Sequence, residues 1–435
     1  MIKQGENGKF LSDTAWNYGA FALMAGVGVI LNFFIAAIMG VAALGVFNQL
    51  YAVFVIVGQL AAMGIHDSAQ KYTAEYAEDE AAQTLVSASS VIGATVIGST
   101  IGLGLYLCSD LIGRVMDSAE VGRGIALIAP GVGLFALNKT LMGLLNGARR
   151  MRAFAAVQSM RVMIILLFCL VVGLSDARPS TLGLAFSLAE ALLAPVLLFL
   201  VRPPLHLVFG KDFVAIFRWL LRHGHFGGRA LVNGFLAESY IRVDIIMLGL
   251  FLGDRQVGIY SFAALFVEGL FQVPVVIRTV ANPVLVRLLI VDEPEKTAKF
   301  TRLAALGSFA VYVVAAFGVM IILPYLAPFF PDDLVMSAHE LLWPLLCGLA
   351  VYAVFIPLDH ILLQAGMPGR QSALMAFNVA INVCLNAILI PLYGLMGAAF
   401  ATAISFVFSS IALNIAAALW LGLDRSLFFT HSIKK

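Results

Sequence analysis

Residues 303–322 read LAALGSFAVYVVAAFGVMII, a run without a single charged side chain. A helix of about 20 apolar residues is long enough to cross the hydrocarbon core of a bilayer. Similar runs recur along the whole 435-residue chain, in which 61% of the residues are hydrophobic and 12% are charged. Soluble domains carry about 25% charged residues. The composition therefore predicts an all-α polytopic membrane protein and excludes a cytosolic enzyme, a nucleic-acid-binding protein and a disordered chain.

The apolar runs predict about twelve transmembrane helices joined by mostly short connections. An outer-membrane barrel does not fit, because its strands alternate polar and apolar residues, whereas these runs are continuous. The longest polar connection is 202–227, and 212–222 within it has the character of an amphipathic surface helix. The predicted spans are 15–39, 42–64, 83–108, 124–147, 154–174, 182–201, 228–252, 256–282, 303–329, 337–364, 371–392 and 396–422.

Basic residues distinguish the two ends of the predicted spans. Most of the 27 lysines and arginines lie at the ends that hold both termini and the 202–227 connection. The loops at the opposite ends contain Arg114, Arg123, Arg178 and Arg255. Cytoplasmic loops carry an excess of Lys and Arg. Both termini are therefore predicted to be cytoplasmic.

The two halves of the chain share a glycine pattern. Gly40-Val-Ala-Ala-Leu-Gly45-Val-Phe47 has the same spacing as Gly253-Asp-Arg-Gln-Val-Gly258-Ile-Tyr260. An even number of predicted spans separates the copies, so both halves would have the same topology. Such repeats are typical of transporters with two lobes related by an axis along the membrane normal. We expect two six-helix lobes in this pseudo-two-fold arrangement, an N-lobe at 1–201 and a C-lobe at 228–435, joined by a cytoplasmic linker at 202–227.

Two stretches of the second half resemble the Wzx-like polysaccharide flippases of bacterial envelopes, which handle O-antigen and exopolysaccharide units. One is 242–263, RVDIIMLGLFLGDRQVGIYSFA, and the other is 378–399, NVAINVCLNAILIPLYGLMGAA. The second contains the family's Asn-rich helix, an Ile-Pro-x-Tyr-Gly turn and a Gly-Ala-Ala helix start. The same superfamily includes multidrug exporters and the lipid II flippase. By contrast, loop 65–82 matches poorly the signature of the major facilitators, another class of twelve-helix transporter.

The resemblance implies a flippase, not an enzyme, in the bacterial inner membrane. It would carry a polyprenyl-diphosphate-linked oligosaccharide from the cytoplasmic to the periplasmic leaflet by ion-coupled alternating access, for O-antigen, lipopolysaccharide or exopolysaccharide synthesis. The expected partners are this substrate and membrane lipids, with a polysaccharide polymerase as a further candidate. The alternative is a cation-coupled multidrug exporter of the same fold, which would need an acidic and aromatic site. A membrane-embedded polymerase or transferase would need a large periplasmic loop, which we do not find.

Basic residues inside the predicted spans are the candidate substrate ligands. A charge at the centre of a bilayer costs roughly 2.5–3.5 kcal/mol, so it should face water or a partner. Guanidinium and ammonium groups are suited to bind diphosphate. For each residue the alternative is a structural pair with a carboxylate or an anchor at the membrane surface. The candidates are Arg242, Lys139, Arg161 and Arg278.

Carboxylates inside the spans are candidates for ion coupling or for charge pairing. A carboxylate whose affinity for H⁺ or Na⁺ differs between two conformations can couple ion flow to transport. Glu190 and Glu268 lie near the middle of their predicted helices, whereas Glu238 lies one turn from Arg242 and could simply neutralise it. No metal ion or cofactor is expected, because the four cysteines form no cluster with each other or with histidine. The candidates are Glu190, Glu238, Asp244, Glu268 and Asp359.

Overall fold

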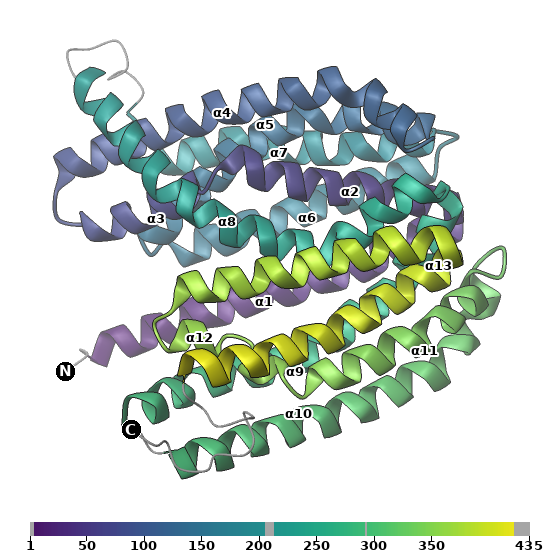
Figure 1. The fold of residues 1–435 in the computed structure, drawn as a ribbon. Helices are drawn as coiled ribbons and strands as arrows, with labels where there is room; N and C mark the ends of the chain where they lie inside the picture. The colour runs from purple at the N-terminus through teal and green to yellow at the C-terminus, as the bar shows by residue number, and fades with distance from the viewer. Residues whose placement is uncertain (1–3, 205–212, 292–293, 422–435) are drawn as a thin grey trace. The chain divides into compact units, whose positions relative to one another are not determined.

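The computed structural model describes residues 4–204, 213–291 and 294–421, and all regular structure in these ranges is helical (Figure 1). Ten segments within them are long and apolar enough to cross a membrane. One of these, α13 (Pro368–Leu421), covers the last two predicted spans up to residue 421. The seventh predicted span lies in α8 (Phe213–Phe251) up to residue 251, and α8 is not among the ten. The all-α polytopic fold is therefore confirmed.

The chain divides into two compact units, Met1–Glu238 and Ser239–Lys435. The boundary lies inside the single helix α8, so each unit contains part of that helix. The predicted lobe limits at 201 and 228 stay predictions. Each unit is described separately below.

Unit 1 consists of long helices joined by short connections. Its elements are α1 (Gln4–Phe34), the π-helix η1 (Ile35–Met39), α2 (Val41–Ala62), α3 (Ile65–Glu75), α4 (Glu80–Val115), α5 (Ala119–Gly147), α6 (Met151–Gly173), the 3₁₀ helix η2 (Pro179–Gly183), α7 (Leu184–Val201) and the first part of α8.

Local sequence signals place several of these helix ends. Two starts have side-chain caps, because Asp79 accepts a hydrogen bond from the Ala82 backbone N–H (2.9 Å) and Ser118 accepts one from Val121 (3.1 Å). Helix α2 ends at Ala62 because Met63 (φ 44°) and Gly64 (φ 64°) both adopt left-handed backbone angles. Helix α3 follows this turn, within a segment that the sequence analysis left as a loop.

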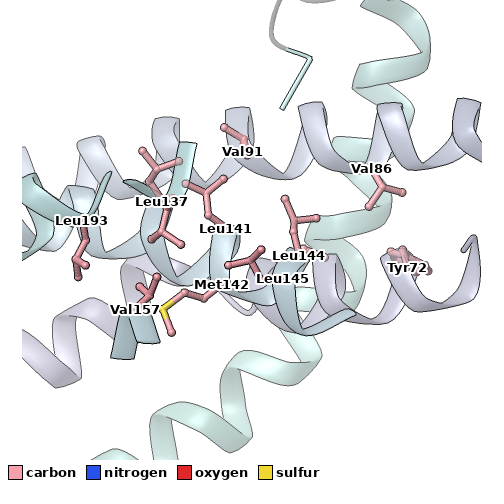
Figure 2. Close-up of a cluster of buried hydrophobic side chains, with 12 residues drawn as sticks. Tyr72, Val86, Val91, Leu137, Leu141, Met142, Leu144, Leu145, Val157 and Leu193 are labelled. Carbon is pink, nitrogen blue, oxygen red and sulfur yellow. The ribbon is translucent and has the colours of Figure 1, made fainter. Parts of the chain in front are cut away.

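The core of unit 1 gathers side chains from α3, α4, α5, α6 and α7, including Tyr72, Val86, Leu141 and Leu193 (Figure 2). Glycines let α4 and α5 approach closely, as is usual between helices in a membrane. A Cβ atom at Gly98 would lie 2.8 Å from the Gly133 carbonyl oxygen. This close packing positions the polar side chains that α5 carries on its other face.

Unit 2 repeats the helical architecture with more interruptions. Its elements are the second part of α8, α9 (Asp254–Val291), α10 (Pro294–Ile322), the 3₁₀ helix η4 (Leu323–Phe329), α11 (Leu334–Ala353), the 3₁₀ turn η5 (Ile356–Leu358), α12 (Ile361–Gln364) and α13. Its core includes Leu285, Ile361, Leu374 and Leu413.

The repeated glycine motif has the same local role in both units. Gly40 directly precedes α2, and Gly253 directly precedes α9. Gly40 has φ 89°, a backbone conformation that glycine adopts without a steric cost. The shared spacing therefore marks the start of the second long helix in each half.

Two predicted spans of unit 2 differ from the observed helices. The span predicted at 337–364 is not continuous, because α11 ends at Ala353 and the chain forms η5 around Pro357 before α12. Proline lacks the backbone N–H that a continuing helix needs. The spans predicted at 371–392 and 396–422 are joined at Gly394, whose φ of 59° and ψ of −135° are accessible essentially to glycine alone. Helix α13 folds back on itself as two arms (Figure 1), and Gly394 is the residue with non-helical backbone angles inside it.

Candidate functional site

Unit 1 contains a buried ion pair between α6 and α7. Glu190 is 1% exposed, and its Oε1 lies 2.8 Å from Arg161 Nε. Arg161 Nη2 also donates to Glu190 Oε2 at 3.3 Å. Asn138 on α5 completes the cluster, because its Nδ2 donates to Oε2 (2.7 Å) and to the backbone carbonyl (2.8 Å) of Glu190. Glu190 therefore holds α5, α6 and α7 together through a charge-assisted network.

Lys139, the next residue on α5, has a different environment. Its Nζ donates to Gln59 Oε1 on α2 at 2.7 Å, and this acceptor is a neutral amide. Among the described residues, no carboxylate lies within 4.0 Å of this ammonium group. The negative charges of Asp67 and Glu238 act on it from further away. Lys139 is therefore a cation held within a span by a neutral partner.

One aromatic ring contacts both Lys139 and Arg161. The ring centroid of Phe135, one turn before Lys139 on α5, lies 5.5 Å from Lys139 Nζ and 5.5 Å from Arg161 Cζ. A cation over the face of an aromatic ring gains electrostatic attraction without being neutralised. The arrangement keeps two positive charges near each other while only Arg161 has an adjacent carboxylate.

The charge of Lys139 affects the pKa values of two residues on α3, His66 and Asp67. Burial lowers the pKa of His66 to about 3, and the positive charge of Lys139 lowers it further in the same sense. Burial raises the pKa of Asp67, while Lys139 opposes that rise. His66 is therefore neutral at physiological pH, and α3 adds no second positive charge beside Lys139.

Unit 2 buries the carboxylate of Asp244 among neutral groups. Asn386 Nδ2 donates to its Oδ1 at 2.8 Å. The hydroxyls of Thr402 (2.6 Å) and Tyr260 (3.0 Å) both donate to its Oδ2. Asn386 also donates to Asn382 Oδ1 at 3.0 Å. Helices α8, α9 and α13 thus meet at one carboxylate, and the groups bonded to it among the described residues are uncharged.

The three oxygens around this contact form a closed triangle. Tyr260 Oη and Thr402 Oγ1 lie 2.9 Å apart, in addition to their 3.0 Å and 2.6 Å contacts with Asp244 Oδ2. Three hydrogen bonds need three protons, but the two hydroxyls supply only two. A proton on Asp244 would supply the third if the three groups donate in turn around the triangle, so that Asp244 donates to one hydroxyl and accepts from the other. The contacts therefore accommodate a protonated Asp244.

An ion pair in unit 2 joins Arg278, a candidate substrate ligand, to Asp359, a candidate for ion coupling or charge pairing. Arg278 Nη1 on α9 donates to both carboxylate oxygens of Asp359, at 3.0 Å and 2.7 Å. Gln371 Nε2 donates to the backbone carbonyl of Asp359 at 2.9 Å. His360 Nε2 lies 3.9 Å from Asp359 Oδ1. Arg278 thus has a dedicated carboxylate beside the break between α11 and α12.

The remaining predicted residues are Glu238, Arg242 and Glu268, and the charge of Glu238 acts on Lys139 of unit 1. Glu238 and Arg242 lie on α8 on opposite sides of the unit boundary, and both side chains are partly exposed. Glu268 is exposed on α9. Its mid-helix position says how deep the residue lies but not which face of the helix carries it, and its role in ion coupling or charge pairing stays a prediction. The charge of Glu268 still acts on Tyr260.

The sequence analysis missed the neutral members of both clusters. Gln59 and Asn138 carry no charge and so escaped a search based on charged residues. Asn382, Asn386 and Tyr260 lay inside the motifs quoted above, where the i, i+4 spacing of the two asparagines places them on one helix face. That spacing was the available signal. Within the described residues, no group of three His, Cys, Asp or Glu residues could hold a metal ion.

The fold is that of a polytopic membrane protein, and solved structures share it. A solved multidrug-resistance MATE transporter of the MOP superfamily, in an inward-facing conformation, aligns with a TM-score of 0.73 over 92% of this chain and 94% of that chain, at 16% identity. The lipid II flippase MurJ, in an inward closed conformation, aligns with a TM-score of 0.74 over 92% of this chain and 86% of that chain, at 14% identity.

The family model for polysaccharide biosynthesis proteins matches residues 10–289, well over half of the chain. The chain belongs to this family, and the resemblance inferred from the two motifs is confirmed. A search of curated proteins found no match. The similar structures are transporters and a flippase, and at these identities they show the fold alone.

Proposed function

We propose that this protein is a flippase that moves a polyprenyl-diphosphate-linked oligosaccharide from the cytoplasmic to the periplasmic leaflet, for O-antigen, lipopolysaccharide or exopolysaccharide synthesis. The membership in the polysaccharide biosynthesis family supports the substrate class. The excess of basic residues at the ends that hold both termini supports an orientation with these termini in the cytoplasm of a bacterial inner membrane. Alternating access by two lobes and delivery to a polymerase complete the proposal.

Lys139 carries the substrate assignment. Its ammonium group lies in a membrane span and is hydrogen-bonded to the neutral amide of Gln59 at 2.7 Å. Placing a charge in a span is costly, and the group hydrogen-bonded to this cation is neutral, so the cation is suited to an anionic ligand. A diphosphate can bring its own negative charge to this lysine, whereas a cationic drug would be repelled. Arg161 contributes positive potential across Phe135, while Glu190 keeps its guanidinium in position.

We further propose that Asp244 couples transport to a cation, and that this cation is H⁺. The oxygen triangle of Asp244, Thr402 and Tyr260 is satisfied by one additional proton. Na⁺ is the alternative coupling ion, because carboxylate, hydroxyl and amide oxygens are also ligands for hard cations. Its binding would need these oxygens to move apart to accommodate the ion.

The test compares Lys139→Gln with Lys139→Arg in proteoliposomes loaded with a fluorescent polyprenyl-diphosphate disaccharide. Flipping is measured as the fraction of probe that an external reductant can reach. We expect Lys139→Gln to lower the rate by about 10–100-fold, because an ion pair with phosphate contributes roughly 1.5–3 kcal/mol. Lys139→Arg keeps the charge and should retain most of the activity.

The matched control is Lys71→Gln, which removes an exposed lysine of α3 that pairs with Glu75 at 3.4 Å. It should flip the probe at the wild-type rate. A Lys139→Gln variant that flips normally would contradict the substrate assignment. If the wild type ignores the lipid probe and instead extrudes ethidium from vesicles, the protein is a multidrug exporter of the same fold.

A further inference from the structure

Helix α8 is longer than a membrane span requires. The helix contains 39 residues, and at 1.5 Å per residue it extends about 58 Å, roughly twice the thickness of the hydrocarbon core. About half of the helix therefore lies outside the hydrocarbon. The segment 213–230 is the N-terminal half of α8 and overlaps the 202–227 connection. We call it the entry segment.

One face of the entry segment is fastened to α3 and α4 in unit 1. His223 Nδ1 lies 2.6 Å from Ser68 Oγ, and its Nε2 lies 3.2 Å from Ser89 Oγ. The Trp219 ring packs edge-on against Tyr72, with centroids 5.4 Å apart. At Gly227 a Cβ atom would meet the Met63 carbonyl oxygen at 2.5 Å, so the backbones touch. This inner face fixes how the segment is rotated about its own axis.

That rotation turns three large apolar side chains outward. Val214 is 59% exposed, Phe217 51% and Leu221 60%. At about 100° per residue these three fall within about 60° of one another around the helix. Exposed apolar side chains at this spacing form a continuous stripe, and water is a poor environment for it.

Basic side chains border this stripe on one side. Arg218, Arg222 and Arg229 are exposed and lie within about 40° of one another, next to the apolar stripe. Arg222 is partly committed, since Glu75 lies 3.7 Å away and the Tyr72 ring centroid 4.4 Å away. No Asp or Glu occurs between residues 213 and 237. The outer face is thus apolar on one edge and basic on the other.

We infer that this outer face binds the anionic surface of the membrane leaflet on its own side, with Val214, Phe217 and Leu221 in the acyl boundary and the arginines on acidic phospholipid headgroups. An apolar stripe beside a basic stripe is the pattern by which a helix face contacts the boundary between headgroups and acyl chains and prefers anionic lipid. Each basic residue near such a surface contributes favourable attraction. Because the inner face is fastened to α3 and α4, the contact anchors unit 1 to that leaflet.

The test measures the thermal stability of the full-length protein in nanodiscs of phosphatidylcholine, with and without phosphatidylglycerol. Arg218→Gln/Arg229→Gln removes two arginines that form no ion pair in the part of the chain that the structure describes. Arg114→Gln/Arg178→Gln is the matched control, because it removes two exposed arginines on the predicted opposite side. We expect phosphatidylglycerol to raise the Tm of the wild type and of the control. In Arg218→Gln/Arg229→Gln the increase in Tm should be at most half as large.

A second measurement reports the position of the apolar stripe. Leu221→Cys in a cysteine-free background carries a fluorophore that lipids brominated near the headgroup can quench. Efficient quenching, stronger with phosphatidylglycerol, is the expected result. A fluorophore that stays in water, or a variant with the full phosphatidylglycerol effect on Tm, overturns the inference and assigns the face to another partner.

Discussion

Each unit buries one carboxylate within its membrane spans, and the two are held in opposite ways. In unit 1, Glu190 is paired with the guanidinium of Arg161 at 2.8 Å. In unit 2, the described partners of Asp244 are the neutral groups of Tyr260, Thr402 and Asn386. A carboxylate that is paired with a fixed guanidinium group has its charge neutralised without binding a proton or a metal cation. A carboxylate surrounded by neutral donors can take up a cation and release it.

The two units differ in whether the charge of their buried groups is fixed or can change. Unit 1 keeps fixed positive charge, because Lys139 is held by Gln59 and Arg161 is held by Glu190. Unit 2 contains the group whose charge can change. Under the proposed function, the fixed charge of unit 1 would serve the anionic substrate and Asp244 of unit 2 would serve the driving ion.

The largest effect is expected from Glu190→Gln. This change leaves Arg161 buried without its counter-charge, which typically costs roughly 3–5 kcal/mol of stability. The Tm of the purified protein in detergent should fall accordingly. Removing both charges with Arg161→Gln/Glu190→Gln should recover part of the loss, since no unpaired charge remains. An unchanged Tm for Glu190→Gln would mean that the two carboxylates are held alike.

Asp244→Asn should leave stability nearly unchanged and abolish coupling. Asparagine keeps the shape and can still bond to Thr402 and Asn386, but it cannot exchange a proton. We expect proton-gradient-driven flipping to fall by about 100-fold, within the usual range of coupling energies. Asp110→Asn on α4 removes an exposed carboxylate and serves as the control. Sodium-driven activity that is unaffected by a proton gradient in the wild type would replace H⁺ by Na⁺.

Acid should weaken unit 1 through His223. Burial lowers the pKa of His223 to about 4, and the Arg222 charge adds to this, although a hydrogen bond with the Val86 backbone opposes it. In the unfolded chain a histidine has a pKa of about 6.5. Between these values only the unfolded chain binds the proton, so stability is full above pH 6.5 and falls as the pH drops. From pH 7 to pH 5 the loss from this residue is about 2 kcal/mol.

Hydrogen exchange in α3 and α4 peptides at both pH values measures this loss in unit 1. His223→Gln should reduce the acid-induced increase in exchange, leaving the contribution of His66. Peptides of α9 and α13 provide the internal comparison from unit 2, where we expect a smaller change. An equal response in both units would show that His223 is not the source.

The smallest effect is expected from Thr402→Val. It removes one of the two hydroxyls from the triangle around Asp244, and a hydrogen bond to a charged group contributes roughly 1.5 kcal/mol, or about tenfold in coupled flipping. Thr402→Ser restores the hydroxyl and should restore the rate. If valine has no effect, Tyr260 alone supports Asp244.

Hydropathy was sufficient to predict most of the spanning helices, because a spanning helix must bury its backbone in an apolar run of sufficient length. It missed α3, whose sequence IHDSAQKYTAE is polar and whose Ala69 and Tyr72 pack in the core of unit 1. It also joined α11 and α12 across Pro357. Helix ends and short polar helices depend on backbone angles and tertiary contacts that average hydropathy does not report.

The charged members of the site could be predicted, but their partners could not. Glu190 was a candidate for ion coupling or charge pairing, and its observed partner is Arg161, 29 residues away in the chain. Asn386 lies 142 residues from Asp244. Partners at such separations are determined by how helices pack, and the sequence of one chain does not reveal that packing. Neutral amides are invisible to a search for charge, although they decide which charges remain unneutralised.

The folding of α13 into two arms has a consequence for biosynthesis. No charged residue occurs from 371 to 421, so both arms of α13 and the turn between them are free of charge. No charged loop then has to be translocated when this hairpin enters the bilayer, and its two arms can insert together. The orientation of the hairpin during insertion therefore depends on the charges at its ends, beginning with Arg370, and the turn contributes no topological signal of its own.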